Sequence, residues 1–193
     1  MIEVRAATVQ DVETLVRLRI EMFREMGWLT GSVTEADLIT ASREYFSAMI
    51  PAKRLFAWLA ADDGKIVGSS GLIFLCKPPT PDNMSGREGY IMNMYTLPEY
   101  RQRGVATALL GECVRFARSM GAGRLSLHAS SLGKPVYQKF GFVDSRAEMR
   151  MAVDAVQRRG EPGLTREVSR ECTGLCRNGQ TGAATASPGV ARE

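Results

Sequence analysis

The chain has 193 residues, of which 45% are hydrophobic and 24% charged, a balance that predicts one globular domain with a core and excludes a fibrous or wholly disordered protein. Its formal net charge is +4, and the basic residues are interleaved with acidic ones, so the charge favours anionic ligands but not nucleic acid as a partner. The four cysteines lack the spacing of a disulfide framework, and neither an apolar leader nor a membrane-length apolar run occurs, so we expect a cytoplasmic protein without a membrane partner.

The N-terminal region predicts a short strand followed by an amphipathic helix. Residues 1–6 alternate between apolar and polar side chains, as a half-buried strand does. After Thr8, a residue type suited to the N-cap of a helix, apolar side chains recur at helical spacing from Val12 to Phe23. Gly27 is expected to end this helix.

A second helix and a hairpin are expected next. Acidic residues in a first turn after Thr34, an apolar pattern and then Pro51 predict a helix over residues 34–49. Residues 54–76 are interpreted as two strands joined at Asp63-Gly64, because this dipeptide suits a tight turn with positive φ. The expected buried residues of the second helix are Leu38, Tyr45, Phe46 and Met49.

The second half of the sequence alternates between strand and helix patterns. It predicts a strand over 89–97, a helix over 105–120, a strand over 124–130, a short helix over 135–140 and a strand pattern over 142–153. The order β-α-α-β-β-β-α-β-α-β therefore predicts an α/β (α+β) fold, with a mixed, mostly antiparallel central sheet flanked by helices.

Residues 154–193 differ in composition from the rest of the chain. They contain Gly, Pro, Thr, Ser and mixed charge without an amphipathic period, so they cannot bury enough apolar surface to offset the entropy of ordering. We expect a domain over residues 1–153 and a disordered C-terminal tail over residues 154–193. Cys172 and Cys176 in this tail form a lone pair, and no metal site is expected because structural zinc needs four ligands.

The segment RQRGVA, Arg101 to Ala106, lies between a predicted strand and the start of a predicted helix. The first backbone N–H groups of a helix have no intrahelical partner, and the helix dipole is positive there. Gly104 and Ala106 are small residues that leave this end of the helix open to a ligand. The segment is typical of an anion site that holds phosphates. The alternative is a surface turn with solvated arginines.

The same segment resembles the R/Q-x-x-G-x-G/A motif of the GNAT N-acetyltransferase superfamily, whose members hold the pyrophosphate of acetyl-CoA with it. Walker and dinucleotide-binding glycine patterns are absent. The flanks agree with the resemblance: MYTLPEYR resembles the bulged strand of the family, and GKPVYQKFGF resembles its next helix. The resemblance covers about residues 2–153 and implies the GNAT fold.

The resemblance implies how this chain contacts acetyl-CoA, its expected co-substrate. The backbones of Met94, Tyr95 and Thr96 would contact the pantetheine arm in a split between two central strands, with the N–H of Met94 as the oxyanion donor. The residues expected at the pyrophosphate are Arg101, Gln102, Arg103, Gly104, Val105, Ala106 and Thr107.

Tyr137 matches a tyrosine that lies near the coenzyme sulfur in many members of the family. A phenol with a pKa of about 10 can donate a proton to a leaving thiolate, so Tyr137 is the candidate general acid. The other interpretation is that Tyr137 belongs to the core of its short helix.

The general base is left open by the sequence. Tyr90 occupies the position that aligns with a catalytic glutamate of some family members. Glu21, Glu25, Glu88 and a water chain are the alternatives, and His128, on a predicted strand, is interpreted as structural.

The leading hypothesis is an acetyl-CoA-dependent N-acetyltransferase. Its acceptor would be a primary amine of a small molecule or peptide, which attacks acetyl-CoA directly in a ternary complex. The alternative is an acyl-CoA-binding sensor or scaffold module without turnover. Many proteins of the family pair into dimers, so a homodimer is compatible with the resemblance.

Overall fold

The computed structural model describes residues 1–29 and 33–145. In chain order the elements are β1 (Ile2–Ala6), the 3-10 turn η1 (Val9–Asp11), α1 (Val12–Glu25), α2 (Glu35–Met49), β2 (Phe56–Asp62), β3 (Lys65–Cys76), β4 (Arg87–Thr96), the 3-10 turn η2 (Pro98–Tyr100), α3 (Val105–Ser119), β5 (Arg124–Leu127) and α4 (Lys134–Lys139). This order confirms the predicted fold class.

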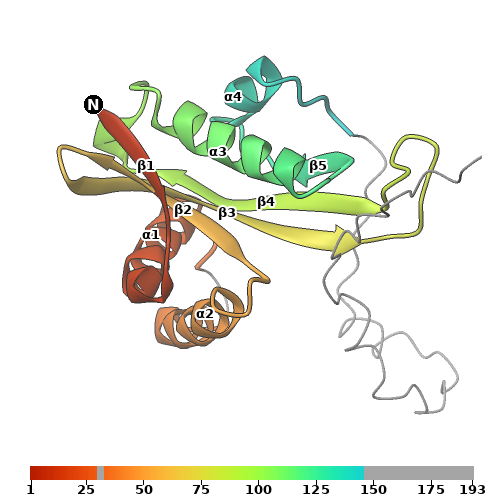
Figure 1. The fold of residues 1–193 in the computed structure, drawn as a ribbon. Helices are drawn as coiled ribbons and strands as arrows, with labels where there is room; N and C mark the ends of the chain where they lie inside the picture. Colours follow the sequence, from red (N-terminus) through yellow and green to blue (C-terminus); the bar gives the residue numbers. More distant parts are fainter. Residues whose placement is uncertain (30–32, 146–193) are drawn as a thin grey trace, which may run out of the picture. The chain divides into compact units, whose positions relative to one another are not determined.

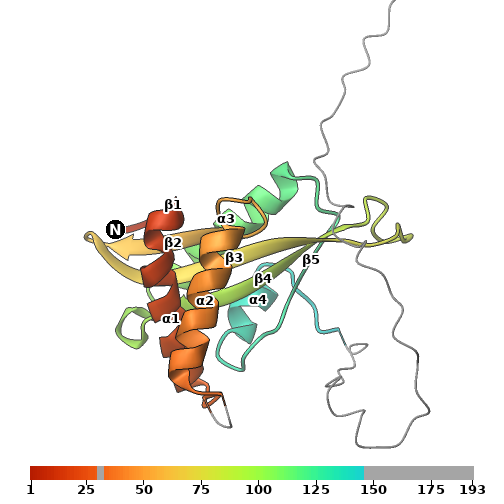
Figure 2. The same cartoon turned by 90° about the horizontal axis from the view of Figure 1, so that it is seen from below.

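The strands form one five-stranded sheet in the order β1-β2-β3-β4-β5. Every pair is antiparallel except β4 with β5, which run parallel. Helices α1 and α2 lie on one face of the sheet, whereas α3 and α4 lie on the other (Figures 1 and 2). The sheet is therefore a mixed, mostly antiparallel layer covered on both faces.

Both faces of the sheet carry a packed apolar cluster. Leu15, Leu18 and Phe46 of the first two helices pack with Leu59 in one cluster, while Leu109 and further α3 residues pack with Val67, Trp58 and Leu72 in the other. A strand covered on both faces needs consecutive apolar residues rather than alternating ones. β2 shows this, because four consecutive residues from Ala57 to Ala60 are buried.

The local signals at two element boundaries are confirmed. Thr34 caps α2 and accepts a hydrogen bond from the N–H of Asp37 at 3.1 Å, while the carboxylate of Asp37 accepts one from the N–H of Thr34 at 3.0 Å. Asp63 and Gly64 adopt φ values of 48° and 79° and join β2 to β3. Two consecutive positive φ values are those of the type I′ hairpin turn.

Two sequence expectations are corrected by the structure, and a third lies mostly outside the described residues. Tyr45 is 39% exposed, because the buried positions of α2 are Ser42 and Phe46, which lie four residues apart on one face, whereas Tyr45 lies about 100° around the helix from Phe46. β5 ends at Leu127, so His128 lies just beyond the strand. Residues 142–145 form no strand, and the rest of the 142–153 pattern lies outside the described residues.

The predicted tail over residues 154–193 also lies outside the described residues, as do Cys172 and Cys176. In the described part of the chain, no helix has both the length and the hydropathy needed to span a membrane. The same residues contain no group of three or more histidine, cysteine or acidic side chains that could hold a metal ion.

Candidate functional site

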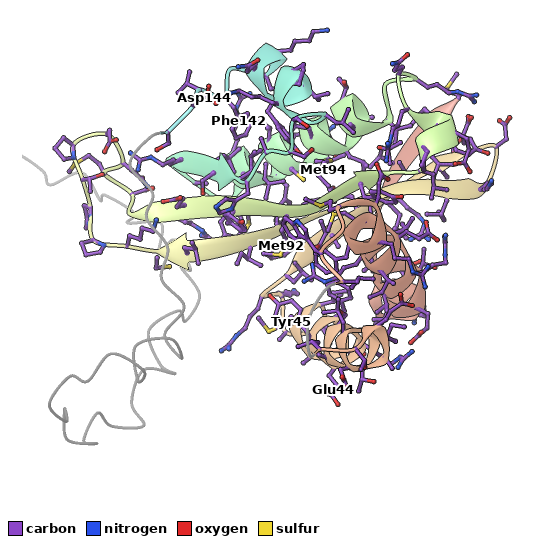
Figure 3. The ribbon with its side chains drawn as sticks, turned by 180° about the vertical axis from the view of Figure 1, so that it is seen from behind. Glu44, Tyr45, Met92, Met94, Phe142 and Asp144 are labelled. Atoms are coloured by element: carbon purple, nitrogen blue, oxygen red, sulfur yellow. The ribbon has the colours of Figure 1, made fainter. Side chains whose placement is uncertain are left out.

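Strand β4 contains a bulge at Asn93 and Met94. Ser69 pairs with Tyr95 and Gly71 with Met92, so the single residue Ser70 opposes two residues of β4. Asn93 adopts a φ of 52°, an unusual conformation for a residue other than glycine. The bulge changes the alternation of side chains, since Met92 packs with the cluster under α1 whereas Met94 packs with the cluster under α3 (Figure 3).

The sheet opens next to this bulge. β5 pairs with β4 only from Glu88 to Ile91, whereas β4 continues to Thr96. Gly89 allows the close pairing before the opening, because a Cβ there would lie 2.6 Å from the side chain of Leu125. A bulged strand whose parallel neighbour stops early has backbone groups without a strand partner on that edge. The resemblance to the family implied such free backbone groups for Met94 to Thr96.

A cavity of about 540 Å³ lies at this opening, between β4, the N-terminus of α3 and α4. It brings together every predicted site residue except Arg103. Its lining residues are Met94, Tyr95, Thr96, Tyr100, Arg101, Gln102, Gly104, Val105, Ala106, Thr107, Leu132, Gly133, Val136, Tyr137 and Lys139. Leu132 and Val136 are apolar walls that the sequence analysis did not name.

The N-terminus of α3 faces this cavity without a side-chain cap. Gly104 is the N-cap residue with a φ of 85°, which is the left-handed conformation that favours glycine. The first intrahelical bond runs from the N–H of Ala108 to the carbonyl of Gly104 at 2.9 Å. The N–H groups of Val105, Ala106 and Thr107 therefore have no intrahelical acceptor and can receive an anion.

The two predicted arginines of this segment are placed differently. The Nε of Arg101 donates to the carbonyl of Thr96 at 3.1 Å, and its guanidinium forms an ion pair with Glu25 at 2.5 Å. Arg103 lies outside the cavity lining, 3.9 Å from Asp62, with its guanidinium 5.2 Å from the ring centroid of Tyr100. The cavity thus offers an anion the open amides of α3, with the cations Arg101 and Lys139 also in its lining.

Thr96 supplies an unsatisfied polar group at the same cavity. Its Oγ1 is buried and forms no hydrogen bond among the described residues. An unsatisfied buried hydroxyl costs about 1–3 kcal/mol, which a ligand with an amide or hydroxyl could recover. The open amides of α3 and this hydroxyl together fit an elongated ligand with an anionic end and a polar arm, as acetyl-CoA is.

Tyr137 of α4 reaches the cavity from the side opposite to β4. It is 8% exposed, and its ring packs edge-on against Phe142 at a centroid distance of 6.0 Å. Burial, and to a smaller extent the thiol of Cys113, raises the pKa of Tyr137 to about 12. The phenol therefore remains a proton donor over the whole neutral range.

The three carboxylates considered as bases lie outside the cavity lining. Arg101 lowers the pKa of Glu25 despite partial burial, and Tyr95 adds a hydrogen bond of 3.2 Å to it. Burial acts to raise the pKa of Glu88, but hydrogen bonds from Lys77 and Ser126 outweigh it and leave the pKa lowered. Glu21 forms an ion pair with Arg17 at 3.0 Å. Glu25 and Glu88, whose carboxyl pKa values are lowered, are therefore weak bases.

Tyr90 and His128 form a contact that the sequence analysis did not find. The hydroxyl of Tyr90 meets the Nδ1 of His128, and the two rings cross at a centroid distance of 5.6 Å. Tyr90 belongs to β4 and His128 follows β5, so the contact sits where the two parallel strands begin to separate.

These features define the class of protein: a mixed α/β fold of the acetyltransferase type, with a ligand cavity where β4 and β5 separate. The acetyltransferase (GNAT) family model matches residues 17–142. The chain belongs to the GNAT acetyltransferase family, whose members generally use acetyl-CoA.

Relatives and solved structures agree with this assignment. A predicted acetyltransferase with acetyl-CoA from Clostridium acetobutylicum is 32% identical, with a TM-score of 0.72 and coverage of 80% of this chain and 98% of that one. A GCN5-related N-acetyltransferase from Ralstonia eutropha JMP134 is 28% identical, with the same TM-score and coverage of 80% and 99%.

A curated relative comes from Trypanosoma brucei brucei. It is a glucosamine 6-phosphate N-acetyltransferase, 33% identical over 89 residues that cover 46% of this chain and 58% of the relative. This chain therefore spans somewhat more than half the length of that protein. An uncharacterized N-acetyltransferase of Bacillus subtilis, YdgE, is 25% identical over 74% of this chain and 92% of its own length.

Proposed function

We propose that this protein is an N-acetyltransferase that moves the acetyl group of acetyl-CoA to a primary amine of a small molecule or peptide. The observation that carries the proposal is one cavity whose lining combines the open N-terminus of α3, Thr96 with its unsatisfied hydroxyl, and Tyr137 with its raised pKa. Membership of the GNAT family and a structural neighbour described with acetyl-CoA support the same co-substrate.

The residues have separate tasks in this proposal. The amides of Val105, Ala106 and Thr107 hold the pyrophosphate, with Gln102 and Arg101 beside them. Met94, Tyr95 and Thr96 direct backbone and hydroxyl groups at the pantetheine arm. Holding the two reactants at attack distance then supplies a large part of the rate acceleration.

The proposed reaction is a direct attack. The amine nitrogen forms a bond to the acetyl carbon, the carbon–sulfur bond breaks, and the amine gives up one proton. The N–H of Met94 stabilises the negative charge on the carbonyl oxygen, and Tyr137 protonates the departing thiolate. Since the carboxylates of Glu21, Glu25 and Glu88 are ion-paired outside the cavity, we assign proton removal from the amine to a water chain.

The acceptor is proposed at the level of its chemical class. The relative that acetylates glucosamine 6-phosphate makes a small amino sugar phosphate one candidate acceptor. The second candidate function is an acyl-CoA-binding module without turnover. It is favoured by the same observation that none of the three carboxylates considered as bases faces the cavity.

Calorimetric titration of acetyl-CoA into the full chain tests the binding step. Gly104→Asp and Gly104→Asn form a matched pair, since both side chains have the same size and tolerate a positive φ, but only aspartate places a negative charge at the helix N-terminus. We expect micromolar binding by the parent, weaker binding by Gly104→Asn and none by Gly104→Asp. Equal affinity of the two variants for acetyl-CoA would contradict phosphate binding at the N-terminus of α3.

Release of the coenzyme thiol with a panel of primary amines tests the transfer step. Acetylation of any amine identifies the enzyme. Binding of acetyl-CoA without turnover across the panel supports the binding module instead.

A further inference from the structure

Arg19 lies where α1, α2 and β4 meet, on the face of the sheet away from α3. Its guanidinium donates a hydrogen bond to Oδ1 of Asn93 and stacks over the ring of Phe23 at 4.4 Å from the centroid. The side chain is half-buried, and burial lowers the pKa of Arg19 while the nearby Tyr45 acts in the opposite direction. Figure 3 shows Tyr45 on the side of α2 that faces the sheet, toward Met92.

Arg19 differs from its neighbours on the same helix in its charge environment. Arg17 pairs with Glu21 at 3.0 Å, and Arg24 pairs with Glu35. Within residues 1–29 and 33–145, no carboxylate oxygen lies within 4.0 Å of a nitrogen of Arg19. A half-buried cation without an anionic partner is costly, so the position gains stability from any anion that reaches it.

Arg19 lies close to the cavity through its contact with Asn93, so the acceptor amine is a suitable molecule to carry that anion. The side chain of Asn93 accepts a hydrogen bond from Arg19. The next residue, Met94, lines the cavity, and the Cα atoms of the two residues lie about 3.8 Å apart. β5 no longer pairs with β4 at this point, so among the described residues this edge of β4 has no strand neighbour at Asn93 and Met94. A group bound to Arg19 would lie close to the carbonyl that Met94 is proposed to polarise.

We propose that Arg19 binds an anionic group, a carboxylate or a phosphate, of the acceptor amine and thereby selects for acceptors that carry one. This inference rests on the proposed transfer function. Arg19 holds the anion while the ring of Phe23 packs against the guanidinium and forms an apolar neighbour of that site. Because Asn93 and Met94 are adjacent, the anion and the amine are separated by few bonds, as in amino acids and small amino sugar phosphates.

Paired acceptors test this selectivity in the full-length protein. Glucosamine 6-phosphate is compared with glucosamine, and phenylalanine with phenylalaninamide, so that each pair differs in one anionic group and the two pairs separate phosphate from carboxylate. We expect one anionic member to have a kcat/KM at least about 10-fold above its neutral partner, as one charged hydrogen bond provides.

Variants of α1 assign the selectivity to Arg19. Arg19→Gln is expected to lower this preference about 10- to 100-fold, and Arg19→Lys is expected to retain part of it. Arg17→Gln removes the same charge from the exposed side of α1 and is expected to leave the preference unchanged.

Three outcomes would overturn the inference. If the parent protein uses neutral and anionic acceptors equally well, the inference about Arg19 is wrong, while the proposed transfer function still stands. If kcat/KM falls by the same factor for anionic and neutral acceptors in a folded Arg19→Gln variant, Arg19 acts only by supporting the bulge through Asn93. Absence of turnover with every acceptor would also overturn the inference about Arg19. Calorimetry with acetyl-CoA then shows whether the protein binds the co-substrate at all.

Discussion

The carboxylate of Glu25 accepts a hydrogen bond of 2.5 Å from the guanidinium of Arg101, although the two residues are 76 positions apart in the chain. Glu25 ends α1 on one face of the sheet, whereas Arg101 belongs to the turn that leads to α3 on the other face (Figure 1). The pair therefore fixes the turn before α3, and with it the direction of the open amides at the cavity.

The first prediction concerns the pH dependence of this pair. Arg101 holds the pKa of Glu25 below its ordinary value of 4.5, so the pair contributes stability that is fully present above that value and is lost as the pH falls through the folded pKa. Both side chains are about one-third exposed, and we expect about 0.5–1 kcal/mol. Thermal unfolding should show Glu25→Gln melting about 2–4 °C below the parent at pH 7.

The difference in melting temperature should disappear toward acidic pH, since the parent then also loses the ion pair. Glu21→Gln is the control, because its partner Arg17 lies on the same helix and joins no second element. A gap between parent and Glu25→Gln that persists unchanged down to about pH 2 would rule out this origin of the stability.

The second prediction uses two glycines of β3. A Cβ at Gly68 would lie 2.8 Å from the backbone carbonyl of Tyr95 and 2.9 Å from Val105, so Gly68→Ala must shift β3 relative to β4 and to the start of α3. A Cβ at Gly71 has no neighbour closer than 3.4 Å. We expect Gly68→Ala to lose about 1–3 kcal/mol of unfolding free energy and to bind acetyl-CoA more weakly.

Gly71→Ala serves as the matched control on the same strand and should change both quantities little. Chemical denaturation and calorimetry measure the two effects. If both alanine variants behave alike, the close approach at Gly68 does not position the cavity.

Local sequence signals predicted most of the fold because they depend on nearby residues. The Asp63-Gly64 turn, the Thr34 cap and the apolar period of α3 each involve side chains within a few positions of one another. The resemblance to the family added the bulged strand and the residues that line the cavity. Tyr45 was misjudged because a helical period does not show how far the buried stripe extends around α2.

The remaining parts of the site depend on contacts between distant segments. Arg101 is expected at the phosphate and lines the cavity, and its additional pairing with Glu25 follows from the packing of α1 beside β4, which no local pattern encodes. The contact of Arg19 with Asn93 and that of Tyr90 with His128 join residues 74 and 38 positions apart. Such pairs become visible only once the sheet is assembled.

The third prediction concerns the cysteines of the described residues. Burial raises the pKa of the Cys113 thiol to about 12, and the side chain is inaccessible within the α3 cluster, whereas Cys76 is exposed at the end of β3. Because the thiolate is the reactive form, iodoacetamide at pH 8 should label Cys76 and leave Cys113 unmodified in the native protein. Peptide mass spectrometry with and without denaturant distinguishes the two, and rapid native labelling of Cys113 would contradict its burial.

The fourth prediction tests Tyr137 as the proton donor. Tyr137→Phe removes the hydroxyl and keeps the ring that packs against Phe142, so the fold and the affinity for acetyl-CoA should be retained. We expect kcat to fall about 100-fold, at the lower end of what general acid catalysis contributes. Since burial raises the pKa of this phenol to about 12, its ionisation should not limit the rate of the parent below about pH 10.

Tyr100→Phe is the matched control for that measurement, because Tyr100 also lines the cavity but lies on the side of the anion-binding turn. Its loss of a hydroxyl should alter KM for acetyl-CoA more than kcat. The assignment of Tyr137 fails if both phenylalanine variants keep the parental kcat, or if the affinity of Tyr137→Phe for acetyl-CoA falls as much as its rate. In the second case Tyr137 forms part of the cavity wall, and the thiolate takes its proton from water.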